Sequence, residues 1–144
     1  MPLIYLHYPE GSLSTDARDS LVNEVTRAGV ELEQLPLTEY VLSTTFAFTR
    51  EYPAGHVYNG GSPVTQAFVS AEINVIQGGY SASTKAALID RVTNSVSKYF
   101  DMPSGEPRRV YVVIREVAEA NWGFDGKTID LQVLRNPPKD AVPL

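Results

Sequence analysis

The chain has 144 residues, of which 43% are hydrophobic and 20% are charged, so it is long enough to bury a sizeable core. It has no cysteine, which excludes disulfides, thiolate catalysis and cysteine-ligated zinc. The net charge of −5 argues against nucleic acid as a partner, and no apolar run is long enough to span a membrane. We expect one cytoplasmic domain over residues 1–144.

The chain begins Met-Pro, and the apolar run over residues 3–8 predicts a strand. Proline is tolerated as the first residue of an edge strand, where no ladder hydrogen bond is lost. The alternative interpretation is chemical, because removal of Met1 would expose the secondary amine of Pro2. If Met1 is retained, the Pro2 nitrogen is a tertiary amide with no basic lone pair. This strand alone leaves both interpretations open.

A helix is predicted over about 15–29, with Ser14 or Thr15 as its N-cap. Apolar residues recur along it at spacings of four and three, which predicts one buried stripe: Ala17, Leu21, Val25 and Ala28. The segment 39–52 is rich in Val, Thr and Phe and is expected to be extended. A glycine-rich stretch over 53–63 follows it.

The same order of elements then returns. A strand is expected over 67–76, a turn with serine caps over 77–83 and a helix over 84–100. A strand over 108–117 and a glycine-containing tail over 118–127 complete the second copy. The apolar stripe of the second helix consists of Leu88, Val92, Val96 and Tyr99.

The two copies also align residue by residue. Arg50 and its following glutamate match Arg115 and its following glutamate, and Gly61 falls on Gly126 without a gap. This repeat indicates two β–α–β units, over about 2–61 and 66–130, with a C-terminal arm over about 131–144.

A fold class follows from the repeat. In a β–α–β unit the two strands are parallel and the helix crosses over between them. Two such units joined edge to edge form a four-stranded mixed sheet with two helices on one face. The uncovered face needs a partner, so we expect a closed homo-oligomer.

A β–α–β repeat that begins Met-Pro, with a strand ending IRE followed by ANWGFDGK, resembles the tautomerase superfamily over about 2–130. Fused two-unit members of that superfamily include cis-3-chloroacrylic acid dehalogenase and malonate semialdehyde decarboxylase. The resemblance implies a homotrimeric, cofactor-free keto–enol tautomerase of a small 2-hydroxy-enoate or 2-oxo acid, with Pro2 as general base or acid. An α-amino group titrates near pH 8, and apolar surroundings disfavour its charged form. The two histidines, His7 and His56, are too few for a metal site without an acidic partner motif, so we expect no metal.

The resemblance also implies arginines that hold the substrate carboxylate, but the family's positions for them hold other residues here. Arg50 and Arg115 are possible replacements, because each shares a strand face with one of those positions. The alternative is that each is a solvent-exposed partner of the glutamate that follows it. Of the two arginines, Arg115 is favoured because it lies next to the ANWGFDGK segment.

Further candidates for substrate contacts are Trp122, which matches an aromatic residue of the family's proline pocket, and Phe46, Tyr80 and Tyr111. Trp122 is equally consistent with a core or trimer contact, and the tyrosines with ordinary packing. Asn121 is a further candidate for a substrate contact. It stands where the dehalogenase has a water-activating glutamate, and an amide is no base at neutral pH. The alternatives to a tautomerase are a non-catalytic trimeric scaffold or ligand-binding member, or a lyase of the dehalogenase or decarboxylase type.

Overall fold

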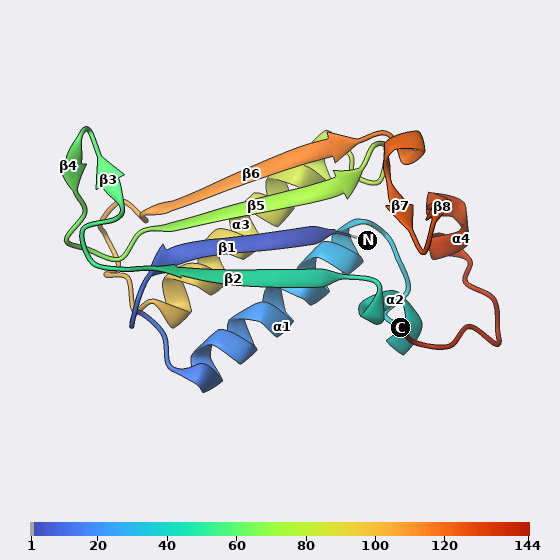
Figure 1. The fold of residues 1–144 in the computed structure, drawn as a ribbon, viewed down its shortest axis with the longest axis horizontal. Helices are drawn as coiled ribbons and strands as arrows, with labels where there is room; N and C mark the ends of the chain where they lie inside the picture. The colour runs from blue at the N-terminus through green and yellow to red at the C-terminus, as the bar shows by residue number, and fades with distance from the viewer. Residues whose placement is uncertain (1) are drawn as a thin grey trace.

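The computed structural model describes residues 2–144, in which two long helices cover one face of a four-stranded sheet (Figure 1). The strands of the sheet are β1 (Leu3–Pro9), β2 (Phe46–Tyr52), β5 (Val69–Ile76) and β6 (Val110–Val117). The helices are α1 (Thr15–Leu32) and α3 (Ala82–Tyr99). The sheet order is β2-β1-β5-β6, which confirms the predicted fold class.

The strand pairing follows the repeat. Strand β1 is parallel to β2, strand β5 is parallel to β6, and the two units meet through the antiparallel pair of β1 and β5. Because β1 and β5 run in opposite directions, the two units begin at opposite ends of the sheet (Figure 1).

Each unit ends in a short hairpin. The first hairpin pairs β3 (Tyr58–Asn59) with β4 (Ser62–Pro63), and the second pairs β7 (Gly123–Phe124) with β8 (Lys127–Thr128). The residues that flank the hairpins are bonded in the same way. The amide of Val64 donates to the carbonyl of Val57 at 2.8 Å, and that of Ile129 to Trp122 at 3.0 Å. Val57 and Trp122 are therefore structural counterparts.

The core lies between the helices and the sheet. Alternate residues of the central strands point into it, including Ile4, Leu6, Ala71 and Ile73. Both predicted helical stripes face this core, with Leu21, Val25, Ala28, Leu88, Val92 and Val96 buried. Ala17 and Tyr99, at the ends of those stripes, are half-buried.

Two segments differ from expectation. The segment 39–52 is not extended throughout, because it begins with helix α2 (Glu39–Ser43) before β2. Thr38 caps this helix by accepting a hydrogen bond from the amide of Val41 at 3.3 Å. The C-terminal arm begins with helix α4 (Leu131–Arg135), and a 3-10 turn, η1 (Glu119–Asn121), precedes the second hairpin.

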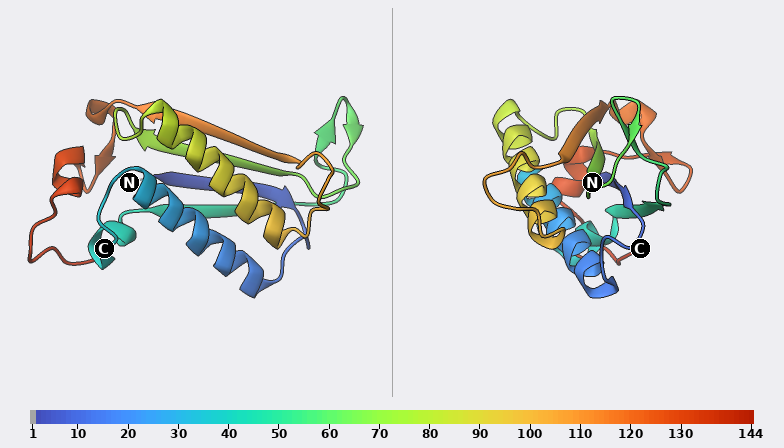
Figure 2. Two further views of the ribbon diagram at one scale, coloured as in Figure 1. Left: turned by 180° about the vertical axis from the view of Figure 1, so that it is seen from behind. Right: turned by 90° about the vertical axis from the view of Figure 1, so that its left-hand side faces the viewer.

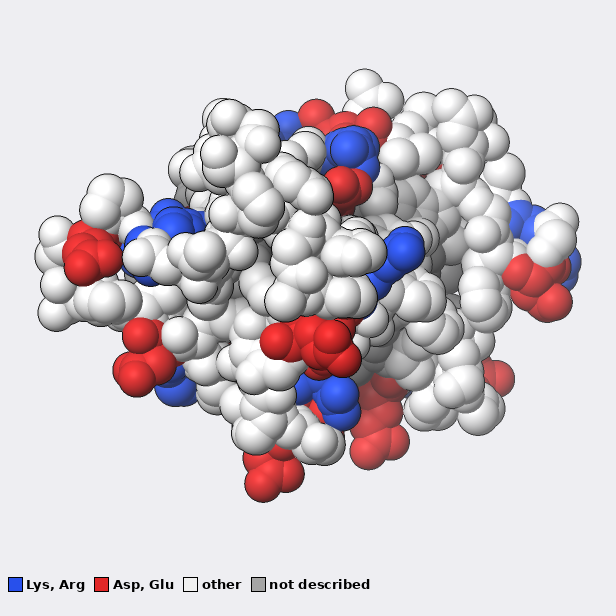
Figure 3. Space-filling view, turned by 60° about the vertical axis from the view of Figure 1, so that its left-hand side comes forward, with Lys and Arg blue, Asp and Glu red and all other residues white. Residues whose placement is uncertain are grey.

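The other face of the sheet has no helix on it in the part of the chain that the structure describes (Figure 2). Its outward side chains include four exposed apolar residues: Phe46, Phe48, Tyr111 and Val113. On the side of the molecule shown in Figure 3, acidic and basic residues are interspersed and no basic patch forms. No helix in the described residues is long and apolar enough to cross a membrane.

Candidate functional site

Pro2 is buried at the beginning of β1, against helix α1. Its ring packs on Gly29, where an added Cβ would lie 2.9 Å from the Cγ of Pro2. Tyr80 closes the same space, because its hydroxyl donates a 2.6 Å hydrogen bond to the carbonyl of Gly29. Glycine at position 29 thus makes room for the proline and leaves its carbonyl open to the tyrosine.

Glu33 lies one helical turn beyond Gly29 and is fully buried. Its carboxyl packs on Gly79, where a Cβ would lie 2.6 Å from Oε1. Burial raises the pKa of Glu33, while the positive charge of Arg135 acts in the opposite direction. Burial also raises the pKa of the Tyr80 phenol, and the charge of Glu33 raises it further. The phenol therefore stays protonated as a hydrogen-bond donor at neutral pH.

Arg135, from helix α4, lies at the same end of the molecule. With Tyr80, Gly79, Ser81 and other residues it lines a cavity of about 220 Å³. The Nε atom of Arg135 is buried and has no hydrogen-bond partner among the described residues. A buried guanidinium N–H without an acceptor is suited to an anionic ligand.

Several predicted residues lie at the Pro2 end of the sheet. The strand register places Phe46, Leu3, Asn74 and Arg115 in one row across the four strands, immediately next to Pro2. Arg115 is bonded to Glu72, the outward-facing residue two positions before Asn74. Arg115 therefore has a carboxylate partner in the structure. That partner is Glu72, whereas the sequence suggested Glu116.

The aromatic and amide candidates of the second unit have different surroundings. Trp122 is buried in an apolar cluster with Val30, Val41 and residues of α4, and Leu3 packs against that cluster. Asn121 is exposed in η1, immediately before Trp122.

Arg50 and Tyr111 lie at the opposite end of the sheet. Arg50 pairs in register with His7, four residues beyond Leu3, so about 13 Å of strand separates the two rows. Tyr111 pairs with Ser70 in that same distant row. Within one chain, neither side chain meets Pro2.

Sequence reasoning did not identify three residues near Pro2, namely Gly29, Glu33 and Arg135. The sequence did contain a pattern that points to Gly29 and Glu33. They are one helical turn apart and continue the core-facing side of α1. Arg135 lies outside the region of family resemblance, in a tail with no repeat counterpart.

Comparison with known proteins gives a consistent result. The family model described as Tautomerase enzyme matches residues 71–132. No curated protein matches this chain significantly.

Among solved structures, the symmetric trimer of a fused 4-OT, Q0, is 26% identical with a TM-score of 0.73. The asymmetric trimer of another fused 4-OT, F6, is 21% identical with a TM-score of 0.74. Each alignment covers 88% of this chain and 94% of the other. N1, a member of the cis-3-chloroacrylic acid dehalogenase family, is 18% identical with a TM-score of 0.74, over 88% of this chain and 82% of its own.

Proposed function

We propose that this chain is a tautomerase-superfamily protein of two fused β–α–β units and that it is a cofactor-free tautomerase. The match of the family model to residues 71–132 and the shared fold of the fused 4-OT structures support this proposal. Its substrate would be a small 2-hydroxy-enoate that it converts into the 2-oxo acid. The observation that carries the proposal is the buried position of Pro2 at the start of β1, against Gly29, whose carbonyl accepts the hydrogen bond of the Tyr80 hydroxyl.

Pro2 would act as both base and acid once Met1 has been removed. Its amine would take the proton of the 2-hydroxyl group, whose oxygen becomes the carbonyl oxygen of the 2-oxo acid. It would return that proton to the adjacent carbon, where a C–H bond forms as the C=C bond becomes a single bond. Apolar surroundings favour the neutral amine, which is the form needed for the first step. An ionised Glu33 would instead stabilise the protonated amine of Pro2. Because burial raises the pKa of Glu33, its carboxyl stays neutral to a higher pH, which weakens this effect.

The substrate carboxylate would be held by an arginine at this end of the molecule. Arg115 lies in the row next to Pro2, and the buried Nε–H of Arg135 has no partner within residues 2–144. Arg50 is too far along β2 to serve the Pro2 site of its own chain. Tyr80 would orient groups around the amine, and Phe46 would limit access of water.

The assembly that fits this function is a homotrimer that covers the open face of the sheet. Two of the structurally similar proteins are trimers, and this chain presents Phe46, Phe48, Tyr111 and Val113 on that face. Covering these side chains removes apolar surface from water.

The test has two steps. Intact mass spectrometry first establishes whether purified protein lacks Met1. Loss of the enol absorbance of phenylenolpyruvate then measures ketonisation by wild type and by Pro2→Ala. We expect wild type to exceed the buffer rate and Pro2→Ala to lose roughly 100-fold or more in kcat/KM, the usual contribution of a general base.

Pro9→Ala is the matched control, because Pro9 ends the same strand far from the site. Full activity in Pro2→Ala would overturn the proline mechanism. Wild-type activity no faster than buffer on several enol acids would instead favour the non-catalytic scaffold.

A further inference from the structure

The cavity that Arg135 lines lies beside the helices, at the end of the sheet where β1 begins (Figure 1). Its lining residues come from the end of α1, the turn between β5 and α3, the first turn of α3 and the last turn of α4. None of them comes from a strand of the sheet. The cavity therefore lies outside the open sheet face that the proposed trimer covers.

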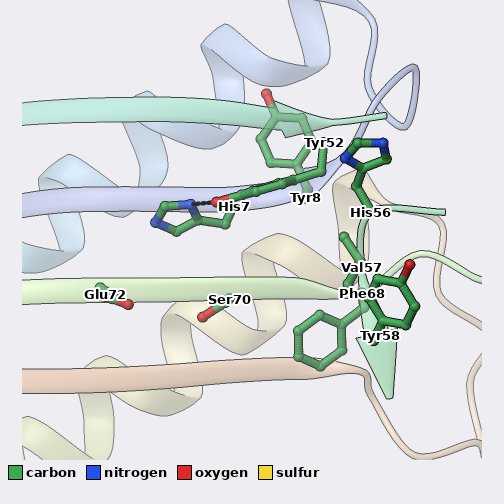
Figure 4. Close-up of a pocket in the computed structure, with 9 residues that line it drawn as sticks. All are labelled: His7, Tyr8, Tyr52, His56, Val57, Tyr58, Phe68, Ser70 and Glu72. Carbon is green, nitrogen blue, oxygen red and sulfur yellow. Dashed lines mark hydrogen bonds between the residues drawn. The ribbon is translucent and has the colours of Figure 1, made fainter. Parts of the chain in front are cut away.

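A larger cavity, of about 330 Å³, differs in this respect (Figure 4). It lies over outward-facing residues of β1 and β5, among them His7 and Ser70. These residues belong to the open face, together with Phe48 and Tyr111. A partner subunit would cover that cavity in the proposed trimer, so the smaller cavity beside Arg135 is the one that a ligand can reach.

Pro2 and Arg135 lie on the same side of the sheet. Successive residues of a strand point to opposite faces, and Pro2 continues the even-numbered, buried side of β1. Its ring accordingly packs on Gly29 of α1. Arg115 is exposed on the opposite, open face, where it is bonded to Glu72. Of these two arginines, only Arg135 lies on the side that Pro2 faces.

The chemistry of the cavity favours an anion. Arg135 is the one charged residue among the described residues that line it. Its Nε–H is buried and has no acceptor within residues 2–144. The Nε–H and a terminal N–H of one guanidinium can bind both oxygens of a carboxylate. The Tyr80 hydroxyl is already used, because it donates to the carbonyl of Gly29 at 2.6 Å.

Glu33 does not cancel the charge of Arg135 under all conditions. Its carboxyl is fully buried behind the wall of the cavity, where it packs on Gly79. Burial raises the pKa of Glu33, so this carboxyl stays neutral to a higher pH than an exposed one. A neutral Glu33 leaves the guanidinium available to an anion from outside.

Helix α4 is held firmly enough to position Arg135. Leu131 and Leu134 are buried in the same apolar cluster as Trp122. The amide of Leu131 donates to the carboxylate of Glu119 at 2.9 Å, which ties the start of α4 to the turn before the second hairpin. Arg135 follows in the last turn, so its side chain projects from an anchored element.

We propose that Arg135 holds the carboxylate of the substrate in this cavity, on the Pro2 side of the sheet, and that Arg115 does not. The identity of the ligand rests on the proposed function, in which the substrate is a small carboxylate. Helix α4 lies outside the two repeated units, so the residue that selects for an acid comes from the C-terminal arm.

The first experiment measures binding without catalysis. The full-length protein is titrated by calorimetry with 3-phenylpropanoate, and with its neutral amide as the control ligand. We expect Arg135→Met to weaken the binding of 3-phenylpropanoate about tenfold or more, because a charge-assisted pair is lost. Arg18→Met is the control variant, since Arg18 lies near the start of α1 and is bonded to Asp19. It should leave the affinity unchanged.

Trp122 reports where the ligand binds. It is the only tryptophan of the chain and packs in one cluster with Leu134, the residue before Arg135. We expect 3-phenylpropanoate to change the fluorescence of Trp122 in wild type and in Arg18→Met. In Arg135→Met the same change should require about tenfold more ligand.

Kinetics with phenylenolpyruvate separate this inference from the tautomerase proposal. Arg135→Met should raise KM about tenfold or more and change kcat less, because the arginine holds the carboxylate in the substrate and in the transition state alike. Pro2→Ala should instead lower kcat. Wild type that is inactive but binds 3-phenylpropanoate through Arg135 would refute the tautomerase and support the carboxylate site.

Two results would overturn the role of Arg135. One is an active wild type whose KM and affinity for 3-phenylpropanoate are unchanged in Arg135→Met. The other is affinity that Arg115→Met abolishes and Arg135→Met preserves, because the carboxylate would then lie on the open face. Circular dichroism and sedimentation of each variant establish that fold and assembly are intact.

Discussion

At the scale of single residues, the absence of a side chain at Gly29 allows Pro2 to pack on α1. Glycine in a helix interior is less favourable than alanine by about 1 kcal/mol, so its presence here has a local cost. The close approach of the Pro2 ring explains why that cost is tolerated.

Gly29→Ala should therefore impair activity more than stability. The new Cβ would lie 2.9 Å from the Pro2 ring and would displace it. Overpacking costs about 1–3 kcal/mol and the helix gains about 1, so we expect a net loss of at most about 2 kcal/mol in unfolding free energy. We expect kcat/KM for phenylenolpyruvate to fall about tenfold or more, because misplaced catalytic groups lose rate steeply.

Gly123→Ala is the control for that variant, since a Cβ there meets no atom closer than 3.5 Å. Unchanged kinetics in Gly29→Ala would contradict the role of Pro2 packing.

Glu33 makes a second residue-level prediction, on the dependence of stability on pH. Its folded-state pKa is raised by burial, so the folded protein retains this proton at pH values where the unfolded chain has lost it. The contribution of Glu33 is thus fully present below its unfolded pKa and declines as pH rises through the folded pKa. Wild-type stability relative to Glu33→Gln should decrease over that interval, as measured by urea unfolding at several pH values. A difference that grows with pH would contradict the raised pKa.

At the scale of elements, α1 and α3 are held side by side by their apolar stripes and by two ion pairs. Lys98 contacts Glu24 and Arg91 contacts Glu31, each at 2.7 Å. Helix α3 is further stabilised at its start by a capping box, in which Ser81 and Thr84 each accept the other's amide hydrogen bond.

The pair of Glu24 and Lys98 should respond to acid. Hydrogen bonds from Lys98 and Tyr99 lower the pKa of Glu24 from 4.5 to about 2. A lowered pKa gives stability that is present above the unfolded pKa and is lost as pH falls through the folded value. Because both side chains are largely exposed, solvent screening keeps the effect small.

We therefore expect Glu24→Gln to be slightly less stable than wild type at pH 6 and equal to it near pH 2. Thermal unfolding at both pH values measures this difference. Glu10→Gln, at an exposed position before α1, is the control. An equal difference at both pH values would refute a role for the ionised pair.

At the scale of the whole molecule, the sheet has one face buried under helices and one open. Stacking of Tyr5 on Phe48, with ring centroids 5.1 Å apart, makes the centre of the open face flat and apolar. A charged side chain on this face would lose its hydration in the proposed trimer and would keep it only in the separated subunits.

Phe48→Glu should consequently abolish the proposed trimer. Sedimentation velocity should give a trimer for wild type and a monomer for the variant, with the circular dichroism spectrum retained. Val142→Glu is the control, since Val142 is 76% exposed in the C-terminal arm, outside the sheet. A trimeric Phe48→Glu protein would place the interface elsewhere.

The sequence alone was enough to predict the repeat, the four strands, the two long helices and the side of each helix that faces the core. These features are local, because residue spacing reports which side chains share a face. It did not reveal α2, which has only five residues and depends on the Thr38 cap.

Which residues lie near Pro2 could not be predicted from the sequence, because it depends on how the two units pair. Arg50 and Arg115 occupy equivalent positions in the two units, but the antiparallel pairing of β1 and β5 sends them to opposite ends of the sheet. Gly29, Glu33 and Arg135 converge there from two distant helices. Residue spacing along the chain shows which side chains share one face of a strand or helix. Which end of the sheet those side chains reach depends on how the strands pair.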